Sequence, residues 1–265
     1  MIKLFRNIRQ NLLNEGKTTK YLQYALGEIV LVVIGILIAL QINDWNDNRI
    51  QKHKEEVYLK NFIRDLKEQL AAIEIQMAYE TNVINVATPI VMYYKMYQGF
   101  KVDSSFSASI GVLGGRKTFV KKSPTYTELI SSGHIDIISD PLLKGRIINY
   151  YQELERIELV INKNNNLYVD AVFIPEMIAL TEMQVVNVTA LGNLVDQFPN
   201  GKLLIDLNEP RLKQITKQRL AMPENELRMI NAVNYRNRIS TIHFAILSMQ
   251  KEKTQHLLDE LISHD

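Results

Sequence analysis

The stretch "GEIVLVVIGILIALQINDWN", from Gly27 to Asn46, decides how this chain is built. It opens with one acid, Glu28, after which no charged residue occurs from Ile29 to Asn43. At about 1.5 Å per helical residue the uncharged run is roughly 22 Å long, between the lengths typical of a core helix and of a membrane span. It could therefore be a membrane span, a cleaved signal peptide, or a buried helix of a soluble domain.

The flanks of this stretch favour the span. Extending it back to Tyr21 gives about 33 Å of helix, enough for a hydrocarbon layer of ~30 Å. Tyr21 and Tyr24 stand at one end and Trp45 at the other, as expected of residues anchored at the two membrane interfaces. From Ile29 to Leu40 the helix is apolar all round, and no Ala-x-Ala cleavage pattern follows it. We predict an uncleaved transmembrane helix over residues 21–45.

Residues 1–20 form a basic leader ahead of the span. On a helical wheel, four apolar side chains share one face and four basic or polar ones share the other: Leu4, Phe5, Ile8 and Leu12 against Lys3, Arg6, Asn7 and Gln10. Such a leader could lie on an anionic leaflet as an amphipathic helix, or it could be a solvated charged tail. We therefore expect the lipid bilayer to be the first partner of the chain.

The basic residues on the two sides of the span indicate its orientation. Five Lys or Arg residues precede it (Lys3, Arg6, Arg9, Lys17, Lys20), and four follow in the equivalent window (Arg49, Lys52, Lys54, Lys60). The positive-inside rule then predicts a cytoplasmic N-terminus by a narrow margin. The expected location is the inner (cytoplasmic) membrane, crossed once, with the C-terminal domain in the periplasm.

Composition argues against several classes of function. Residues 1–43 carry five basic and two acidic side chains, a net +3, and the remainder carries 26 basic and 27 acidic ones, a net −1. That balance offers no electrostatic footprint for nucleic acid. The chain has no cysteine, which excludes disulfides, thiol catalysis and cysteine zinc sites. No P-loop, Gly-x-Ser-x-Gly or His-Glu-x-x-His motif occurs, so we expect no catalytic residues, cofactor or metal.

Residues 46–265 are predicted to be all-α, a bundle of long helices with coiled-coil-like spacing. A first apolar series steps by four and three, interrupted only at Glu80: Leu59, Ile63, Leu66, Leu70, Ile73, Met77, Ile84, Ala87 and Val91. Pro89 should kink or end that helix near Thr88.

A second series has the same spacing and should close at Pro175: Leu143, Ile147, Tyr150, Leu154, Ile157, Ile161, Asn164, Tyr168 and Ala171. A third runs through the last helix: Ile230, Val233, Phe244, Leu247, Leu258 and Leu261, widened by Ile239, Ile242 and Ile246. Ser123-Pro124 and Asp140-Pro141 are typical of helix starts, Gly133 of a helix stop, and further helices should begin near Pro210 and Pro223.

Three segments resemble a known family. They are "GEIVLVVIGILIALQINDWN", "SPTYTELISSG" (Ser123 to Gly133) and "IINYYQELE" (Ile147 to Glu155). Together they resemble an uncharacterised family of single-span membrane proteins, common in Bacteroidetes, that is known only as a domain of unknown function. Asp44 departs from the asparagine more usual at its position. The resemblance implies the anchored architecture and supplies no catalytic residue.

Within the span, Glu28, Gly35 and Ala39 lie roughly in one stripe. Gly35-x-x-x-Ala39 is a small-x-x-x-small pair that lets helices approach closely, and an acid in a span is a functional candidate. The stripe could bind a partner helix. Alternatively, Glu28 sits at the level of the lipid headgroups, seven residues from Tyr21, where its cost is small.

In the bundle, Tyr150, Asn164, Asn237 and Arg238 are polar positions in or beside the apolar series. They could line a small-molecule pocket, or buried asparagine could fix the register of the helices. His243 is interpreted as an ordinary packed residue.

These features predict a membrane-anchored, non-enzymatic helical protein whose extracytoplasmic domain binds a ligand or a membrane or envelope protein, including a second copy of itself. The alternatives are a structural subunit of a cell-envelope complex and a membrane-bound hydrolase.

Overall fold

The computed structural model describes residues 18–182 and 209–264, and in these ranges every regular element is helical. This confirms the all-α prediction. The chain forms two compact units, Met1–Tyr58 and Leu59–Asp265. Helix α2, Thr18–Tyr97, contributes to both units.

In the first unit, α2 contains the apolar stretch, and its side chains are exposed. Its most apolar window has a mean hydropathy of 2.6, and none of that window is buried. Among the described residues this is the one helix long and apolar enough to cross a membrane. Trp45 is 65% exposed, and the Arg49 guanidinium lies 5.6 Å from the centre of its ring. The leader over residues 1–17 and the side chains of Tyr21 and Tyr24 lie outside the described part of the structure.

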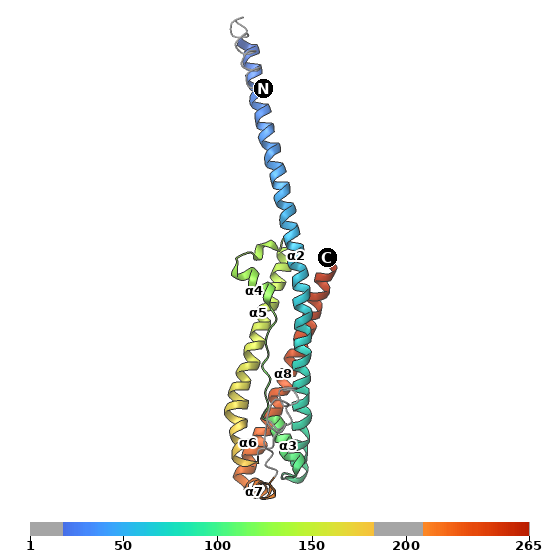
Figure 1. The fold of residues 1–265 in the computed structure, drawn as a ribbon, viewed down its shortest axis with the longest axis vertical. Coiled ribbons are helices and arrows are strands. Elements are labelled where there is room, and N and C mark those ends of the chain that lie inside the picture. Colours follow the sequence, from blue (N-terminus) through green and yellow to red (C-terminus); the bar gives the residue numbers. More distant parts are fainter. Residues whose placement is uncertain (1–17, 183–208, 265) are drawn as a thin grey trace, which may run out of the picture. The chain divides into compact units, whose positions relative to one another are not determined.

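The second unit is a helical bundle whose long members are the later part of α2, α5 and α8 (Figure 1). The remaining elements are shorter, and α3 and α7 lie toward one end of the unit while α4 lies toward the other. The bounds are α3 Ser104–Leu113, α4 Pro124–Ser131, η1 Ile135–Ile137, α5 Pro141–Asn164, η2 Asn165–Phe173, α6 Ile174–Leu180, α7 Pro210–Leu220 and α8 Pro223–His264. Helices α4, α5, α7 and α8 begin at a proline, as predicted, because the first N–H groups of a helix have no intrahelical partner.

The buried face of α2 differs from the predicted apolar series. At every second position, the buried residue lies one residue before the predicted one. The buried residues step by four and three, with Asp65 buried in addition beside Leu66: Phe62, Leu66, Gln69, Ile73, Gln76, Glu80, Val83 and Ala87. Glu80, which interrupts the predicted apolar stripe, lies in the middle of this face. Pro89 does not end the helix, because Thr88 and Pro89 are exposed and the Asn85 carbonyl that loses its donor is at the surface.

The predicted series in α5 is confirmed from Leu143 to Ile161 and wrong beyond it. From Ile161 the buried residues step by four: Asn165, Val169, Phe173 and Met177. The cause is the π-helix η2, whose wider turns advance the inward face. Tyr168 and Ala171 therefore leave the core, and Asn164 is half-buried while Asn165 is buried. Pro175 lies in the first turn of α6, which continues the helical path to Leu180, so it does not close the helix.

The buried face of α8 steps by four and three: Met229, Val233, Arg236, Ser240, His243, Leu247, Gln250, Thr254, Leu257 and Leu261. Half of these side chains are polar, whereas Ile242 and Phe244 are exposed. An apolar cluster that includes Phe106, Phe173 and Leu220 joins α3, η2, α6 and α7 to α2 and α8.

The register of α5 yields a matched test. Truncating Ile161, which is fully buried, should lower the free energy of unfolding by about 2–5 kcal/mol because it leaves a cavity. Truncating Leu159, which is 66% exposed two residues earlier, should change it by no more than about 0.5 kcal/mol. Chemical denaturation of Ile161→Ala and Leu159→Ala, followed by circular dichroism, measures both. Equal losses would contradict the register.

Candidate functional site

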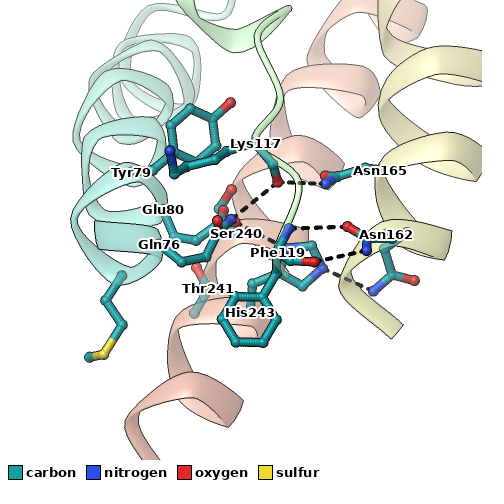
Figure 2. A network of polar contacts seen from close by, with 12 residues as sticks. Gln76, Tyr79, Glu80, Lys117, Phe119, Asn162, Asn165, Ser240, Thr241 and His243 are labelled. Carbon is teal, nitrogen blue, oxygen red and sulfur yellow. Dashed lines mark hydrogen bonds and ion pairs between the residues drawn. The ribbon is translucent and has the colours of Figure 1, made fainter. Parts of the chain in front are cut away.

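The polar residues of the helix faces converge on an extended segment, residues 114–123, which links α3 to α4 and has no helix or strand of its own (Figures 1 and 2). A chain in this conformation cannot satisfy its backbone N–H and C=O groups internally, so a partly buried one requires partners from outside. Helices α2 and α5 provide them from their side chains.

Helix α2 holds the segment through three inward side chains. The Asp65 carboxylate accepts from the Thr125 N–H at 2.9 Å, just beyond the segment. The Gln69 amide oxygen accepts from the Lys122 N–H at 2.6 Å. Further along, the Gln76 amide donates to the Lys117 carbonyl at 3.3 Å. Polar residues therefore take these inward positions of α2, because their side chains form hydrogen bonds to the backbone of the segment and of the residue just beyond it.

The other side of the segment is held from α5 and η2. The Asn162 amide forms two bonds to Phe119, accepting from its N–H at 3.2 Å and donating to its carbonyl at 3.0 Å. The Glu158 carboxylate accepts from the Lys121 N–H at 3.0 Å. Asn165 donates to the Lys117 carbonyl at 3.0 Å. The segment is thus bonded to helices on both sides, much as a strand is bonded by its neighbours in a sheet.

One turn from these contacts, the buried side chains of Glu80 and His243, labelled in Figure 2, and the half-buried amide of Asn164 form a largely buried row. His243 Nδ1 lies 3.2 Å from Glu80 Oε1, and His243 Nε2 lies 3.1 Å from Asn164 Nδ2. Gln76 also donates to Glu80 Oε1, at 2.9 Å. This row connects α2, α8 and the end of α5.

A buried cation stands beside the row. Arg236 is 2% exposed and donates to the carbonyls of Leu113 and Gly115, each at 3.1 Å. Its Nη1 donates to the Ser240 hydroxyl at 2.6 Å, and its Nη2 to the Tyr79 hydroxyl at 3.4 Å. Arg236 therefore holds the start of the extended segment through hydrogen bonds to backbone carbonyls.

The charge of Glu80 is stabilised where it lies. Burial by itself raises the pKa of Glu80, but hydrogen bonds from His243, Ser240 and Gln76 outweigh it and hold the pKa below its ordinary value of 4.5. Burial raises the pKa of Tyr79, which keeps its phenol neutral as a partner for Arg236. Glu80 and His243 are 1% and 0% exposed at the side chain, so the row is out of reach of any substrate in this conformation. Its contacts serve to join helices.

Two surface grooves are formed by described residues of the second unit. One, of about 320 Å³, lies between α2 and α3 and is lined mainly by apolar and aromatic residues, including Ile90, Tyr93, Phe100 and Phe106. The other, of about 520 Å³, lies between α5 and α8. Most of its lining residues are charged, and Tyr150 also lines it.

The structure does not gather the predicted polar residues into one pocket. The Tyr150 hydroxyl bonds to Thr254 at 3.0 Å, and burial raises the pKa of Tyr150 to about 12 despite hydrogen bonds that lower it. Asn164 joins the buried row, whereas Arg238 is exposed. The buried amide oxygen of Asn237 has no hydrogen-bond partner among the described residues. In the first unit, Glu28 is half-buried, and Gly35 and Ala39 are exposed.

The residues that sequence reasoning missed are polar members of the seams: Asp65, Gln69, Gln76, Glu80, Asn162, Asn165 and Arg236. His243, interpreted from the sequence as a packed residue, is buried. A usable signal was present, because Gln69, Gln76 and Glu80 keep the four-three spacing with Phe62, Leu66 and Ile73. Apolar periodicity alone cannot find a seam in which polar residues hold the inward positions.

Residues 28–197 match the family of unknown function DUF6090. The chain belongs to that family. No curated protein and no solved structure matches it.

The DUF6090 match includes the apolar stretch, the extended segment and the side chains of α2, α5 and η2 that hold it. Helix α8, which contributes Arg236 and His243, lies beyond the matched residues. Membership therefore supports the shared architecture and assigns no chemistry to the buried row.

The lowered pKa of Glu80 gives a pH prediction. Its contribution to stability is fully present above the unfolded value and is lost as pH falls through the lower folded value. Glu80→Gln should cost about 1.5–3 kcal/mol at neutral pH, because it replaces the charged acceptor of buried hydrogen bonds by a neutral one. The difference from the parent should then shrink as the pH is lowered below 4.5.

The matched control is Glu74→Gln, because Glu74 is 57% exposed, pairs with Lys251 and lies on the same helix. Its effect should be small at every pH. Urea unfolding between pH 3 and pH 8 measures all three proteins. A difference between Glu80→Gln and the parent that stays constant across that range would contradict the assignment.

Proposed function

We propose that this DUF6090 protein is a single-pass protein of the inner membrane, anchored by residues 21–45, whose helical second unit binds a partner outside the cytoplasm. The observation that carries the anchor is the exposure of the apolar stretch. Ile34, Ile36 and Leu37 are 50–58% exposed in a helix that is apolar all round. Such a helix is stable when hydrocarbon surrounds it.

The proposed orientation has the N-terminus in the cytoplasm. It is supported by the excess of Lys and Arg ahead of the stretch, five against four, in line with the positive-inside rule. Trp45, exposed at the other end, is then an anchor at the periplasmic interface.

Binding rather than catalysis is the proposed role of the second unit. Within the described residues of this unit, the acid–imidazole pair of Glu80 with His243 is fully enclosed and committed to joining helices. The apolar groove between α2 and α3 offers Ile90, Tyr93 and Phe100 for contact with a partner protein. Exposed apolar patches rimmed by polar residues are typical of protein–protein interaction sites.

The anchor is tested by a charge in its centre. Ile34→Lys should move a substantial share of the protein out of the membrane fraction after alkaline extraction, because a lysine at the middle of a span costs about 2.5–3.5 kcal/mol on insertion scales. Ile50→Lys, on the same helix outside the stretch and 43% exposed, is the control and should stay in the membrane. Intact mass of the parent distinguishes an anchor from a cleaved signal peptide. Recovery of the parent as a soluble, full-length chain would contradict the anchor.

The binding role is tested by purification from gently solubilised membranes. One companion protein should elute with the tagged chain in a fixed ratio. Ile90→Asp should abolish this co-elution, because it places a charge in the apolar groove. Leu159→Asp, at an exposed position on α5, should preserve it. Circular dichroism confirms that both variants are folded. A companion that survives Ile90→Asp, or none at all, would refute the groove as the docking surface.

A further inference from the structure

Pro89 removes a hydrogen bond from the interior of helix α2. Proline has no N–H, so the carbonyl of Asn85, one turn earlier, receives no bond from residue 89, and a proline inside a helix is destabilising for this reason. The helix continues to Tyr97 all the same. Pro89 is exposed, so burial of its ring does not offset the cost. The helix therefore leaves a backbone acceptor open at its surface.

The open acceptor borders the apolar groove between α2 and α3. Asn85 and Pro89 both line this groove, whose volume is about 320 Å³. Val86, Ile90 and Phe106 are among the residues that make its lining largely apolar. Binding pockets of about 300–1,000 Å³ combine such a lining with a few polar groups that orient the ligand. At the lower end of that range, the groove has room for one large side chain.

The aromatic residues of the groove are held in place by other rings. The ring centre of Phe100 lies 5.6 Å from that of Phe106 and 5.3 Å from that of Tyr94. The ring centre of Tyr93 lies 4.5 Å from that of Tyr97. Walls fixed in this way lose little conformational entropy on binding, and aromatic rings pack well against another ring. The groove is therefore suited to an aromatic occupant.

Charge disfavours a cationic occupant. None of the described residues that line the groove is acidic, whereas Lys101 is one of them. Lys101 pairs with Asp103 at 3.2 Å, and the Asp103 carboxylate also accepts from the Phe106 N–H at 3.0 Å, so both charges are already engaged. A lysine or arginine occupant would bring a positive charge and several donors. Indole is neutral and aromatic, and its N–H is a donor only.

We propose that the groove between α2 and α3 takes a tryptophan side chain of the partner protein. The indole ring lies beside Ile90 and Phe100, and its N–H donates to the Asn85 carbonyl, which Pro89 keeps open. This inference rests on the docking role proposed above for the groove and names the anchor that the partner presents. Tryptophan is among the residues most enriched at the centres of protein interfaces.

The test needs no partner protein. The full chain in lipid nanodiscs is titrated with N-acetyltryptophanamide and with its 1-methylindole analogue, which keeps the ring and lacks the N–H, and saturation-transfer NMR measures both affinities. The parent should bind the N–H probe roughly two- to tenfold more tightly, the effect of one neutral hydrogen bond. Pro89→Ala supplies an N–H to the Asn85 carbonyl and should make the two affinities equal. A change in apolar contact affects both probes alike, so the ratio reports the hydrogen bond.

Three controls accompany the titration. Alanine favours a helix interior, so Pro89→Ala should fold, which circular dichroism verifies. Pro175→Ala, at an exposed proline in the first turn of α6, is the matched variant and should keep the preference of the parent. Ile90→Asp should abolish binding of both probes, and its nanodiscs measure how much probe enters the lipid.

Equal binding of the two probes to the parent, a preference that survives Pro89→Ala, binding that survives Ile90→Asp, or no binding to the parent would each overturn the tryptophan anchor. Failure of the docking role is a separate result. A companion protein that is lost in Ile90→Asp, together with equal binding of the probes, would keep the docking surface and refute the anchor. The predicted preference with no companion eluting would support the indole site and refute the docking role.

Discussion

The bundle depends on one constraint: an extended stretch of backbone lies among helices, and its hydrogen bonds must come from side chains. Amide and carboxylate groups of Gln76, Glu158 and Asn162 meet that need. Leaving one buried backbone group unpaired costs about 1–3 kcal/mol, comparable to what a buried apolar residue contributes. The polar seams of α2 and α5 are therefore a requirement of the connection between α3 and α4.

The same requirement brings charge into the core. Arg236 bonds to two carbonyls at the start of the segment and donates to the hydroxyls of Ser240 and Tyr79. Ser240 and His243 in turn hold the carboxylate of Glu80 ionised. Shared contacts with Ser240 thus link the row that resembles catalytic groups to the backbone of Leu113 and Gly115.

Much of the architecture could be predicted from local sequence. Proline at the first turn marks four helix starts, Asp140 caps α5 through a 2.8 Å bond from the Leu142 N–H, and Gly133 takes the left-handed conformation after α4. The inward face of α5 follows from its apolar spacing up to Ile161. These features depend on neighbours within a few residues of the chain.

The candidate site could not be predicted in the same way, because its polar residues face a segment some 40 residues away in sequence. In α2, Phe62 and Ile63 are equally apolar, and the contacts of Gln69 and Gln76 decide which of the two faces inward. In α5, the π-helix moves the inward position from Asn164 to Asn165, which no apolar pattern encodes.

The double bond of Asn162 to Phe119 has an evolutionary consequence. The carboxamide of Asn162 both gives and takes a hydrogen bond at that position; aspartate lacks the donor, and leucine lacks both functions. Sequence change at residue 162 is thereby tied to the path of the extended segment around Phe119. Substitutions of Asn162 are tolerable chiefly together with others that change the path of the segment. The effects of substitutions at the two places should therefore depend on one another.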